Sequence, residues 1–236
     1  MQQERRVKPG PDAKALAKME LFIGVPPETL AGLSSAARIE YVAKGHVIFE
    51  QGGHADRAYA VGEGSVRIVQ TGSDGAQVLI RFIASGEMFA TVPIFTNHKF
   101  PADAIAAERS LILSWSEADL LKMIEARPQA AMNVIRILGA RLAEVQDRLR
   151  EIATQSVERR VANALLRLAA QAGQSTAEGT EIAIPIRRKD LAEISGTTLH
   201  TASRVLAAWE KSGLLLSGKQ RLTIHRLSAI RRIAGG

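Results

Sequence analysis

Short apolar stretches separated by glycine-containing turns run from Arg38 to Ser114. The stretches are rich in β-branched residues and read RIEYVA, HVIFE, RAYAV, SVRIVQT, AQVLIRFIA and SLILSW. Strands of this kind, spaced about ten residues apart, are typical of a β-sandwich or a β-barrel. We therefore expect a β domain here, with two short helices before it, around Ala17–Ile23 and Pro27–Ala37.

The pattern changes to a helical period after Ser114. Ser116 is suited to cap a short helix, because Glu117 and Asp119 would lie in its first turn, where the helix dipole favours acidic side chains. A second, long helix is predicted to begin at Pro128 and to continue to residue 155. Its apolar residues alternate at intervals of three and four and fit the a and d positions of a heptad repeat, namely Ile135, Leu138, Leu142, Val145, Leu149 and Ile152.

This apolar stripe needs a partner, because charged residues flank it on both sides. The partner is either a second copy of the same helix or the β domain of the same chain. A heptad repeat with charged flanks favours the second copy, so we predict a dimerisation helix and a homodimer.

A helix-turn-helix pattern follows in RRKDLAEISGTTLHTASRVLAAWEKSG. Before it, Ser156 is expected to cap a helix that ends at a turn-rich loop, Gly173–Gly179. The pattern itself predicts a first helix over Lys189–Ile194 and a second helix that starts at Thr197 or Thr198. Gly196 between them can adopt the positive φ that a tight helix–helix turn requires. One face of the second helix is apolar and consists of Leu199, Ala202, Leu206 and Trp209.

The opposite face of the second helix carries short polar residues and an arginine, which suits the major groove of DNA. The segment LLLSGKQRLTIHRL then predicts a β-hairpin wing, and the first helix begins without a Ser or Thr cap. The alternative is an ordinary helical hairpin with a solvated polar face. The residues that we expect to meet bases or phosphates are Arg187, Arg188, Thr197, Thr198, His200, Ser203, Arg204, Lys219 and Arg221.

The distribution of charge agrees with a polyanionic partner. The chain has 236 residues and a net charge of +7. Residues 1–155 contain 18 basic and 18 acidic side chains, whereas residues 156–236 contain 13 basic and 6 acidic ones. A neutral first part joined to a basic last part indicates a regulatory region and a region that meets nucleic acid, although a basic surface without a partner would give the same count.

Other features of the composition exclude several classes of protein. The absence of cysteine excludes disulfides, thiolate zinc sites and cysteine-ligated iron–sulfur clusters. No apolar run is long enough to span a bilayer and the N-terminus is no signal peptide, so we expect a cytoplasmic protein that does not contact a membrane. Residues 1–17 are polar, contain two prolines, and are expected to be a flexible tail.

In this order of parts the chain resembles the CRP/FNR family of bacterial transcription regulators over residues 18–232. The motifs that carry the resemblance are Lys44-Gly45, Phe49-Glu50-Gln51-Gly52, Val61-Gly62-Glu63-Gly64, Gly86-Glu87-Met88-Phe89 and the second helix of the helix-turn-helix. The resemblance implies an α+β fold, with a β-roll sensor domain over 18–127, a dimerisation helix over 128–155 and a winged helix-turn-helix over 156–236. It also implies an activator that binds a palindromic promoter site on double-stranded DNA and contacts RNA polymerase.

Departures from the family pattern bear on the effector. In the members that bind cyclic nucleotides, an Arg-Ser pair about ten residues after Gly-Glu holds the phosphate. Here Gly86 and Glu87 are present, but the later position reads Lys99-Phe100-Pro101-Ala102, and no arginine occurs between Glu87 and Glu108. Because a lysine is a poor substitute for a bidentate arginine at a buried phosphate, we expect no cyclic AMP. The iron–sulfur members need cysteines, which this chain lacks.

The same region is apolar, which fits either a plain β-roll core or a pocket for a planar ligand such as haem. The stretch GTTLHTASRVLAAWE resembles the branch of the family that responds to nitric oxide and controls denitrification genes, for which haem is the suggested sensor. The candidate axial ligands are His46, His54, His98 and Met88. The candidate pocket consists of Phe82, Gly86, Glu87, Met88, Phe89, Phe95 and Phe100.

In relatives that read TTGA-type half-sites, a Glu-x-x-Ser-Arg pattern contacts bases. Ser203 and Arg204 match this pattern, and Arg204 is expected to contact a guanine, whereas His200 replaces the glutamate. Two alternatives stay open: a regulator of the same fold without an effector, and a metalloenzyme of the cupin type. The second lacks support, because no H-x-H pattern occurs in the chain.

Overall fold

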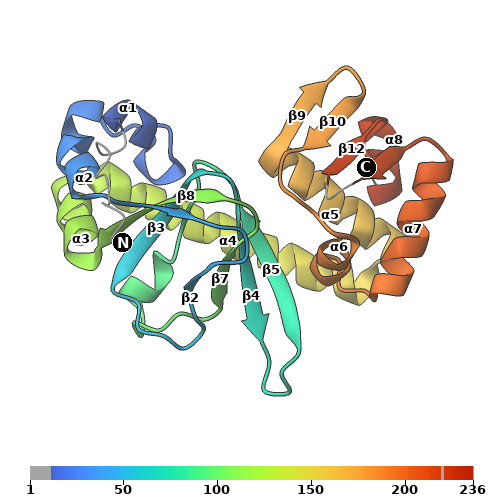
Figure 1. Cartoon of the computed structure of the whole chain (residues 1–236), viewed down its shortest axis with the longest axis horizontal. Coiled ribbons are helices and arrows are strands. Elements are labelled where there is room, and N and C mark those ends of the chain that lie inside the picture. The colour runs from blue at the N-terminus through green and yellow to red at the C-terminus, as the bar shows by residue number, and fades with distance from the viewer. Residues whose placement is uncertain (1–11, 219–220, 236) are drawn as a thin grey trace, which may run out of the picture. The chain divides into compact units, whose positions relative to one another are not determined.

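The computed structural model describes residues 12–218 and 221–235, which form two compact units (Figure 1). One unit contains the chain up to Val66 together with Ser85–Arg141. The other contains Arg67–Ala84 together with Leu142 and the residues after it. This division differs from the boundaries expected from the sequence, because residues 67–84 join the C-terminal unit and the long helix is shared between both units.

Short helical turns open the first unit. They are α1 (Ala13–Leu16), η1 (Glu20–Phe22), η2 (Pro27–Leu30) and α2 (Ala31–Ala36). Asp12 caps α1 by accepting a hydrogen bond from the backbone N–H of Lys14 at 3.1 Å, and Leu16 is fully buried. The flexible tail predicted for residues 1–17 is therefore wrong for residues 12–17, because the side chain of Leu16 enters the core. Residues 1–11 lie outside the described residues.

The predicted β domain is confirmed as two antiparallel layers in the first unit. β1 (Arg38–Val42), β8 (Ser110–Ser116), β3 (Arg57–Glu63) and β6 (Met88–Phe89) are neighbours in that order. β2 (Val47–Phe49) pairs with β7 (Asp103–Ala106), and the turn η3 (Val92–Phe95) precedes β7. The turn at Gly64 requires glycine, because its φ is +81° and a Cβ there would lie 2.7 Å from the carbonyl oxygen of Arg109.

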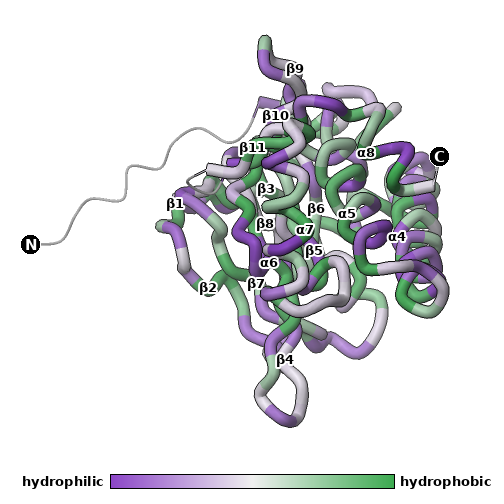
Figure 2. The backbone as a smooth tube through the Cα atoms, turned by 90° about the vertical axis from the view of Figure 1, so that its right-hand side faces the viewer, coloured by the Kyte–Doolittle hydropathy of each residue, from purple (hydrophilic) through white to green (hydrophobic). Residues whose placement is uncertain are grey.

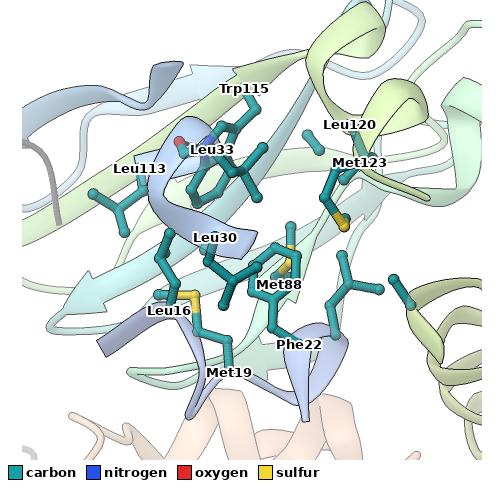
Figure 3. Close-up of a cluster of buried hydrophobic side chains, with 14 of the residues drawn as sticks. Leu16, Met19, Phe22, Leu30, Leu33, Met88, Leu113, Trp115, Leu120 and Met123 are labelled. Atoms are coloured by element: carbon teal, nitrogen blue, oxygen red, sulfur yellow. Dashed lines mark hydrogen bonds between the residues drawn. The ribbon is translucent and has the colours of Figure 1, made fainter. Parts of the chain in front are cut away.

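The N-terminal turns cover one sheet through a cluster of buried apolar side chains (Figure 3). Trp115 on β8 is fully buried, and its Nε1 donates a hydrogen bond to the carbonyl oxygen of Leu33 at 2.7 Å. Phe22 packs edge-on against the same indole. Burying each large apolar side chain contributes about 1.5–3 kcal/mol, so this cluster fixes the N-terminal turns on the sheet.

Two helices follow the sheet. α3 (Glu117–Ala126) is capped by Ser116, as predicted, whose Oγ accepts from the N–H of Asp119 at 3.2 Å. The predicted long helix is confirmed as α4 (Pro128–Thr154). Near its start, Asn133 donates to the carbonyl oxygens of Leu21 and Ile23 at 2.9 and 2.8 Å. No helix in the described part of the chain is both long and apolar enough to cross a bilayer.

The strands β4 (Val66–Thr71), from Arg67 onward, and β5 (Gln77–Ile83) belong to the second unit and are neighbours in a sheet. Side chains of the later helices hold the backbone of β5. The N–H of Leu79 donates to Glu193 Oε2 at 2.8 Å, and the carbonyl oxygen of Ile80 accepts from Arg148 Nη1 at 2.7 Å. These bonds explain why the two strands cluster with the C-terminal part of the chain.

The rest of the second unit is a winged helix-turn-helix. Its helices are α5 (Val157–Ala172), α6 (Arg188–Ile194), α7 (Leu199–Lys211) and α8 (Leu227–Ala234). Its strands are β9 (Gly173–Thr176), β10 (Gly179–Ile182), β11 (Leu215–Gly218) and β12 (Arg221–Ile224), in the order β11-β12-β10-β9. The turn-rich loop expected at Gly173–Gly179 is in part a strand, because its backbone pairs with β10 although its side chains are polar and exposed.

Candidate nucleic-acid interface and effector region

The turn between α6 and α7 has the geometry expected of a helix-turn-helix. Gly196 has a φ of +63°, and the N–H of Thr197 donates to the carbonyl oxygen of Ala192 at 2.9 Å. Thr198 is the N-cap of α7, since its Oγ1 accepts from the N–H of Thr201 at 3.2 Å. The hydroxyl of Thr198 is therefore used within the helix end, while the side chain stays exposed.

α7 has one buried face and one exposed edge. Ala202, Leu206 and Trp209 are buried, and Trp209 Nε1 donates to Glu158 Oε1 at 3.1 Å. The prediction that Leu199 belongs to this face is wrong, because its side chain is 50% exposed. α7 starts at Leu199, and the buried face of the helix begins one turn later.

The exposed edge of α7 holds the residues predicted to contact bases. His200 and Arg204 are exposed and Ser203 is partly exposed. Arg204 forms no ion pair with the acidic side chains that the structure describes. A guanidinium and two small hydrogen-bonding groups on one accessible helix edge can reach base edges in a major groove.

Arg187 already has a partner inside the chain. Its Nε and Nη2 donate to Asp190 at 2.9 and 2.6 Å, and its backbone N–H donates to the same carboxylate at 2.9 Å. Asp190 is buried and also lies 3.5 Å from Arg67 Nη2. The hydrogen bond to Asp190 raises the pKa of Arg187. Asp190 thus serves the start of α6 where the sequence has no Ser or Thr cap.

Arg188 has partners as well. Its Nη2 donates to both carboxylate oxygens of Glu210 at 3.1 and 3.0 Å and to the hydroxyl of Ser217 at 3.3 Å. The side chain thereby joins α6, α7 and β11. A phosphate contact by Arg187 or Arg188 stays a prediction. To make such a contact, each guanidinium would have to bind the phosphate as well as its present carboxylate partner.

The wing is only partly described. Lys219 lies outside the described residues. Arg221 at the end of the strand pair is exposed, and its Nη1 donates to Glu181 Oε1 at 2.7 Å. Surface ion pairs of this kind contribute at most about 1 kcal/mol, so Arg221 can exchange this partner for a phosphate at low cost.

Sequence reasoning missed Arg160 on α5. Its guanidinium donates to the carbonyl oxygens of Ser195 and Gly196 in the helix-turn-helix turn. No sequence pattern marks such a residue, because its acceptors are backbone atoms far along the chain.

The apolar stripe of α4 is exposed in the single chain. Its six predicted members have exposed fractions between 39% and 68%. Figure 2 shows apolar and polar segments alternating along this helix. An apolar surface of this length is unusual on a monomer and marks an interaction site. The members are Ile135, Leu138, Leu142, Val145, Leu149 and Ile152.

The predicted effector pocket is brought together only in part. Phe89 and Phe100 are buried and belong to a four-ring cluster with Phe49 and Tyr59. Phe49 stacks on Phe100 with ring centroids 3.8 Å apart. Sequence reasoning missed Phe49 and Tyr59 as members of this cluster. Burial raises the pKa of Tyr59.

The other predicted pocket residues lie elsewhere. Phe82 belongs to the second unit, and Phe95 is 44% exposed. Met88 packs in the apolar cluster of Figure 3. Gly86 and Glu87 form a turn beside Val61, whose N–H donates to the carbonyl oxygen of Glu87 at 3.0 Å.

The candidate haem ligands differ in their surroundings, and only His54 and His98 among them are paired, with ring centroids 5.9 Å apart. His46 and His54 are exposed, and Met88 is buried in the apolar cluster that also contains Phe22 and Trp115. His98 Nδ1 lies 3.5 Å from Glu117 Oε2, which leaves the imidazole with a carboxylate partner. The described residues also contain no group of three or more His, Asp or Glu side chains able to hold a metal ion. Haem ligation by His46, His54, His98 or Met88 stays a prediction.

Comparisons with known families match two separate parts of the chain. Residues 39–127 match the model of a cyclic nucleotide-binding domain. Residues 159–233 match the model of a Crp-like helix-turn-helix domain.

Similar proteins and structures extend over nearly the whole chain. The cyclic AMP receptor protein of Thermus thermophilus is 29% identical over 216 residues, which cover 92% of this chain and 97% of that protein. The nitrogen fixation regulation protein FixK of Azorhizobium caulinodans is 27% identical, with 88% and 82% covered. The structure of FixK2 from Bradyrhizobium japonicum, 22% identical, has the same fold with a TM-score of 0.75, covering 85% of this chain and 98% of that one.

Proposed function

The chain belongs to the CRP/FNR family of transcription regulators, and on this premise we propose that it binds palindromic promoter DNA as a homodimer and activates transcription. The observation that carries the proposal is the exposed polar edge of α7 opposite the buried Trp209 face. As a family member the protein is a regulator rather than an enzyme. Contact with RNA polymerase belongs to the same proposal and rests on the family resemblance.

The α4 stripe supports the homodimer. Two copies of the helix would bury the six apolar side chains in a coiled-coil seam. A two-fold dimer presents two α7 helices to half-sites about 34 Å apart, which explains why the expected site is a palindrome.

Arg204 is the residue that we assign to base recognition. A guanidinium can donate two hydrogen bonds to O6 and N7 of one guanine, which an ammonium cannot do with the same geometry. Ser203 lies beside it, and His200 occupies the place of the glutamate that relatives use. Loss of that acceptor alters the preference at one base pair of the half-site.

The test compares Arg204→Ala with Arg204→Lys on a site selected from random DNA. We expect both variants to lose about 1–3 kcal/mol of discrimination at one guanine, because the lysine retains charge without the bidentate contact. Binding of the wild type and of both variants is measured by fluorescence anisotropy on the site and on each single-base variant. Retention of full base preference by Arg204→Lys would contradict the assignment of Arg204 to a base.

The effector is not cyclic AMP in this proposal, although two relatives carry that ligand in their names. At the position where nucleotide-binding members have an Arg-Ser pair, Phe100 is buried and stacked on Phe49. A buried phosphate there would lack a bidentate cation. Calorimetry with cyclic AMP should therefore show no binding, and heat of binding at micromolar nucleotide would overturn this part.

A response to nitric oxide through haem, with control of denitrification genes, is supported only by the resemblance of GTTLHTASRVLAAWE. The absorption spectrum of the purified protein with added haem tests it, and an unchanged haem spectrum would leave a regulator without haem. Two alternatives would then remain, namely a response to another apolar ligand and activity without an effector. To distinguish them, the DNA affinity of the protein purified from cells is compared with the DNA affinity of the same protein after unfolding and refolding.

A further inference from the structure

We propose that Arg160 is a positioning residue of the DNA-binding turn, which it fixes against the end of α4. Arg160 lies in the first turn of α5. Its Nε donates to the carbonyl oxygen of Ser195 at 2.9 Å, and its Nη2 to that of Gly196 at 3.1 Å. Its Nη1 donates to the carbonyl oxygen of Gln155 at 2.9 Å. One side chain thus joins the turn before α7 to the junction between α4 and α5.

The carbonyl oxygens that Arg160 contacts lie at the ends of two helices. Ser195 is the C-cap of α6, and Gln155 directly follows the last residue of α4. The final carbonyls of a helix have no partner within it and carry the negative end of its dipole. A cation that donates hydrogen bonds to both helix ends holds α4 and α6 in a fixed orientation to each other. Only the planar guanidinium has enough donors in a rigid arrangement for this purpose.

The same two parts also lie close together at a second point. The φ of Gly196 is +63°, and a Cβ at this position would lie 3.3 Å from Cγ1 of Ile152. Ile152 is the last member of the α4 stripe, so the helix that we assign to dimerisation ends directly against the turn. Because Thr198 caps α7 two residues after Gly196, the position of this turn sets where α7 begins.

This inference rests on the proposed function, in which α7 reads bases. The three carbonyl oxygens that accept from the Arg160 guanidinium all belong to the backbone of the chain, so the contribution of Arg160 to DNA binding is geometric. Misplacing α7 weakens contacts with base edges, whereas phosphate contacts tolerate small displacements. Loss of Arg160 should therefore reduce specific binding much more than non-specific binding.

The experiment compares Arg160→Gln with Arg159→Gln in the full-length protein. Arg159 is the neighbour on the same helix and is exposed, and its Nη2 donates to the carbonyl oxygen of Ala234 at 3.3 Å, away from the turn before α7. Both variants lose one positive charge. Affinity for the selected palindrome and for a scrambled duplex is measured by anisotropy over a range of salt concentrations.

For Arg160→Gln we expect about tenfold weaker binding to the palindrome, equivalent to about 1.4 kcal/mol, and less than about twofold change on the scrambled duplex. The salt dependence should stay as in the wild type. Arg159→Gln should bind the palindrome within about twofold of the wild type. Arg160→Lys should stay weakened, because an ammonium cannot bridge the three carbonyls, and it provides the same test should Arg160→Gln fail to fold.

Two results would overturn the inference. Equal losses on both duplexes, with the salt slope reduced by about one and rescue by lysine, would identify Arg160 as a phosphate ligand. Unchanged binding by Arg160→Gln would show that the turn needs no such support. Failure of the proposed function looks different, because the wild type itself would then bind the two duplexes equally.

Discussion

Helices α4 and α7 are both amphipathic, but they place their apolar faces in opposite environments. In α7 the apolar residues Ala202, Leu206 and Trp209 are buried inside the DNA-binding unit, and the polar edge is exposed. In α4 the apolar residues of the stripe are the exposed ones.

The difference shows what each helix still requires. A helix whose apolar face is covered by its own domain is complete, and its exposed polar edge is available for a polar ligand such as DNA. A helix whose apolar face is uncovered requires another apolar surface. Mutations in the apolar face of α7 should therefore lower the stability of the monomer, whereas mutations in the apolar stripe of α4 should weaken association.

The largest effect is expected from acidic residues in the α4 stripe. Leu142→Glu with Leu149→Glu places charges in the proposed seam, which costs several kcal/mol per buried charge. Sedimentation equilibrium should show monomers, and affinity for the palindrome should fall by at least about 100-fold, since each monomer then binds one half-site.

The control for this pair is Ala143→Glu, which adds one negative charge, against two in the pair, at an exposed position outside the stripe of the same helix. It should leave the dimer and the affinity unchanged. A dimeric Leu142→Glu/Leu149→Glu protein would contradict the assignment of the stripe to association.

A second prediction contrasts Trp209→Ala with Leu149→Ala. Trp209 is buried and its removal should cost about 3–5 kcal/mol of unfolding free energy in the monomer. The loss should be the same at low and high protein concentration. Leu149 is 68% exposed in the single chain, so Leu149→Ala should lower stability only where dimers form.

Urea unfolding at two protein concentrations distinguishes the cases. If Leu149→Ala lowers the urea midpoint of unfolding equally at both protein concentrations, the proposed difference in environment between α4 and α7 is contradicted. That outcome would place Leu149 in a contact within the monomer.

Much of the helical part could be predicted from the sequence, because the periods that define α4 and α7 are local. The heptad stripe, the cap at Ser116 and the glycine of the turn each depend on residues a few positions apart. Leu199 was placed wrongly because periodicity does not show where the packed surface next to a helix ends.

The parts that escaped prediction depend on pairing between distant segments. Phe49 and Tyr59 join Phe89 and Phe100 only because segments far apart in the sequence pack together in the fold, which the order of residues does not reveal. The strand β9 has a polar sequence, GQST, and is formed by backbone pairing with β10. The partner of Arg187 is three residues away, yet arginine and aspartate at that spacing also occur on solvated helices.

The smallest predicted effect concerns two glycines, one in each of the regions compared. Gly139 lies inside α4, and a Cβ there would meet nothing within 4 Å in the single chain. Gly139→Ala should raise the unfolding free energy by about 0.5–1 kcal/mol, because alanine restricts the unfolded chain and favours a helix. Gly196→Ala, in the turn before α7, should lower the unfolding free energy by about 1–2 kcal/mol, because the φ of Gly196 is positive and Ile152 is close.

Thermal unfolding of the two variants, with sedimentation as the second measurement, tests this opposition of sign. A methyl group at position 139 also probes the proposed seam, since the residue follows Leu138 of the stripe. Stabilisation with unchanged dimerisation means that a partner helix leaves room there. Weaker dimerisation by Gly139→Ala means that the two α4 backbones approach closely at this turn of the seam. A lower unfolding free energy for Gly139→Ala with unchanged dimerisation would contradict a regular helix at Gly139, and the comparison between the helices would then lose its basis.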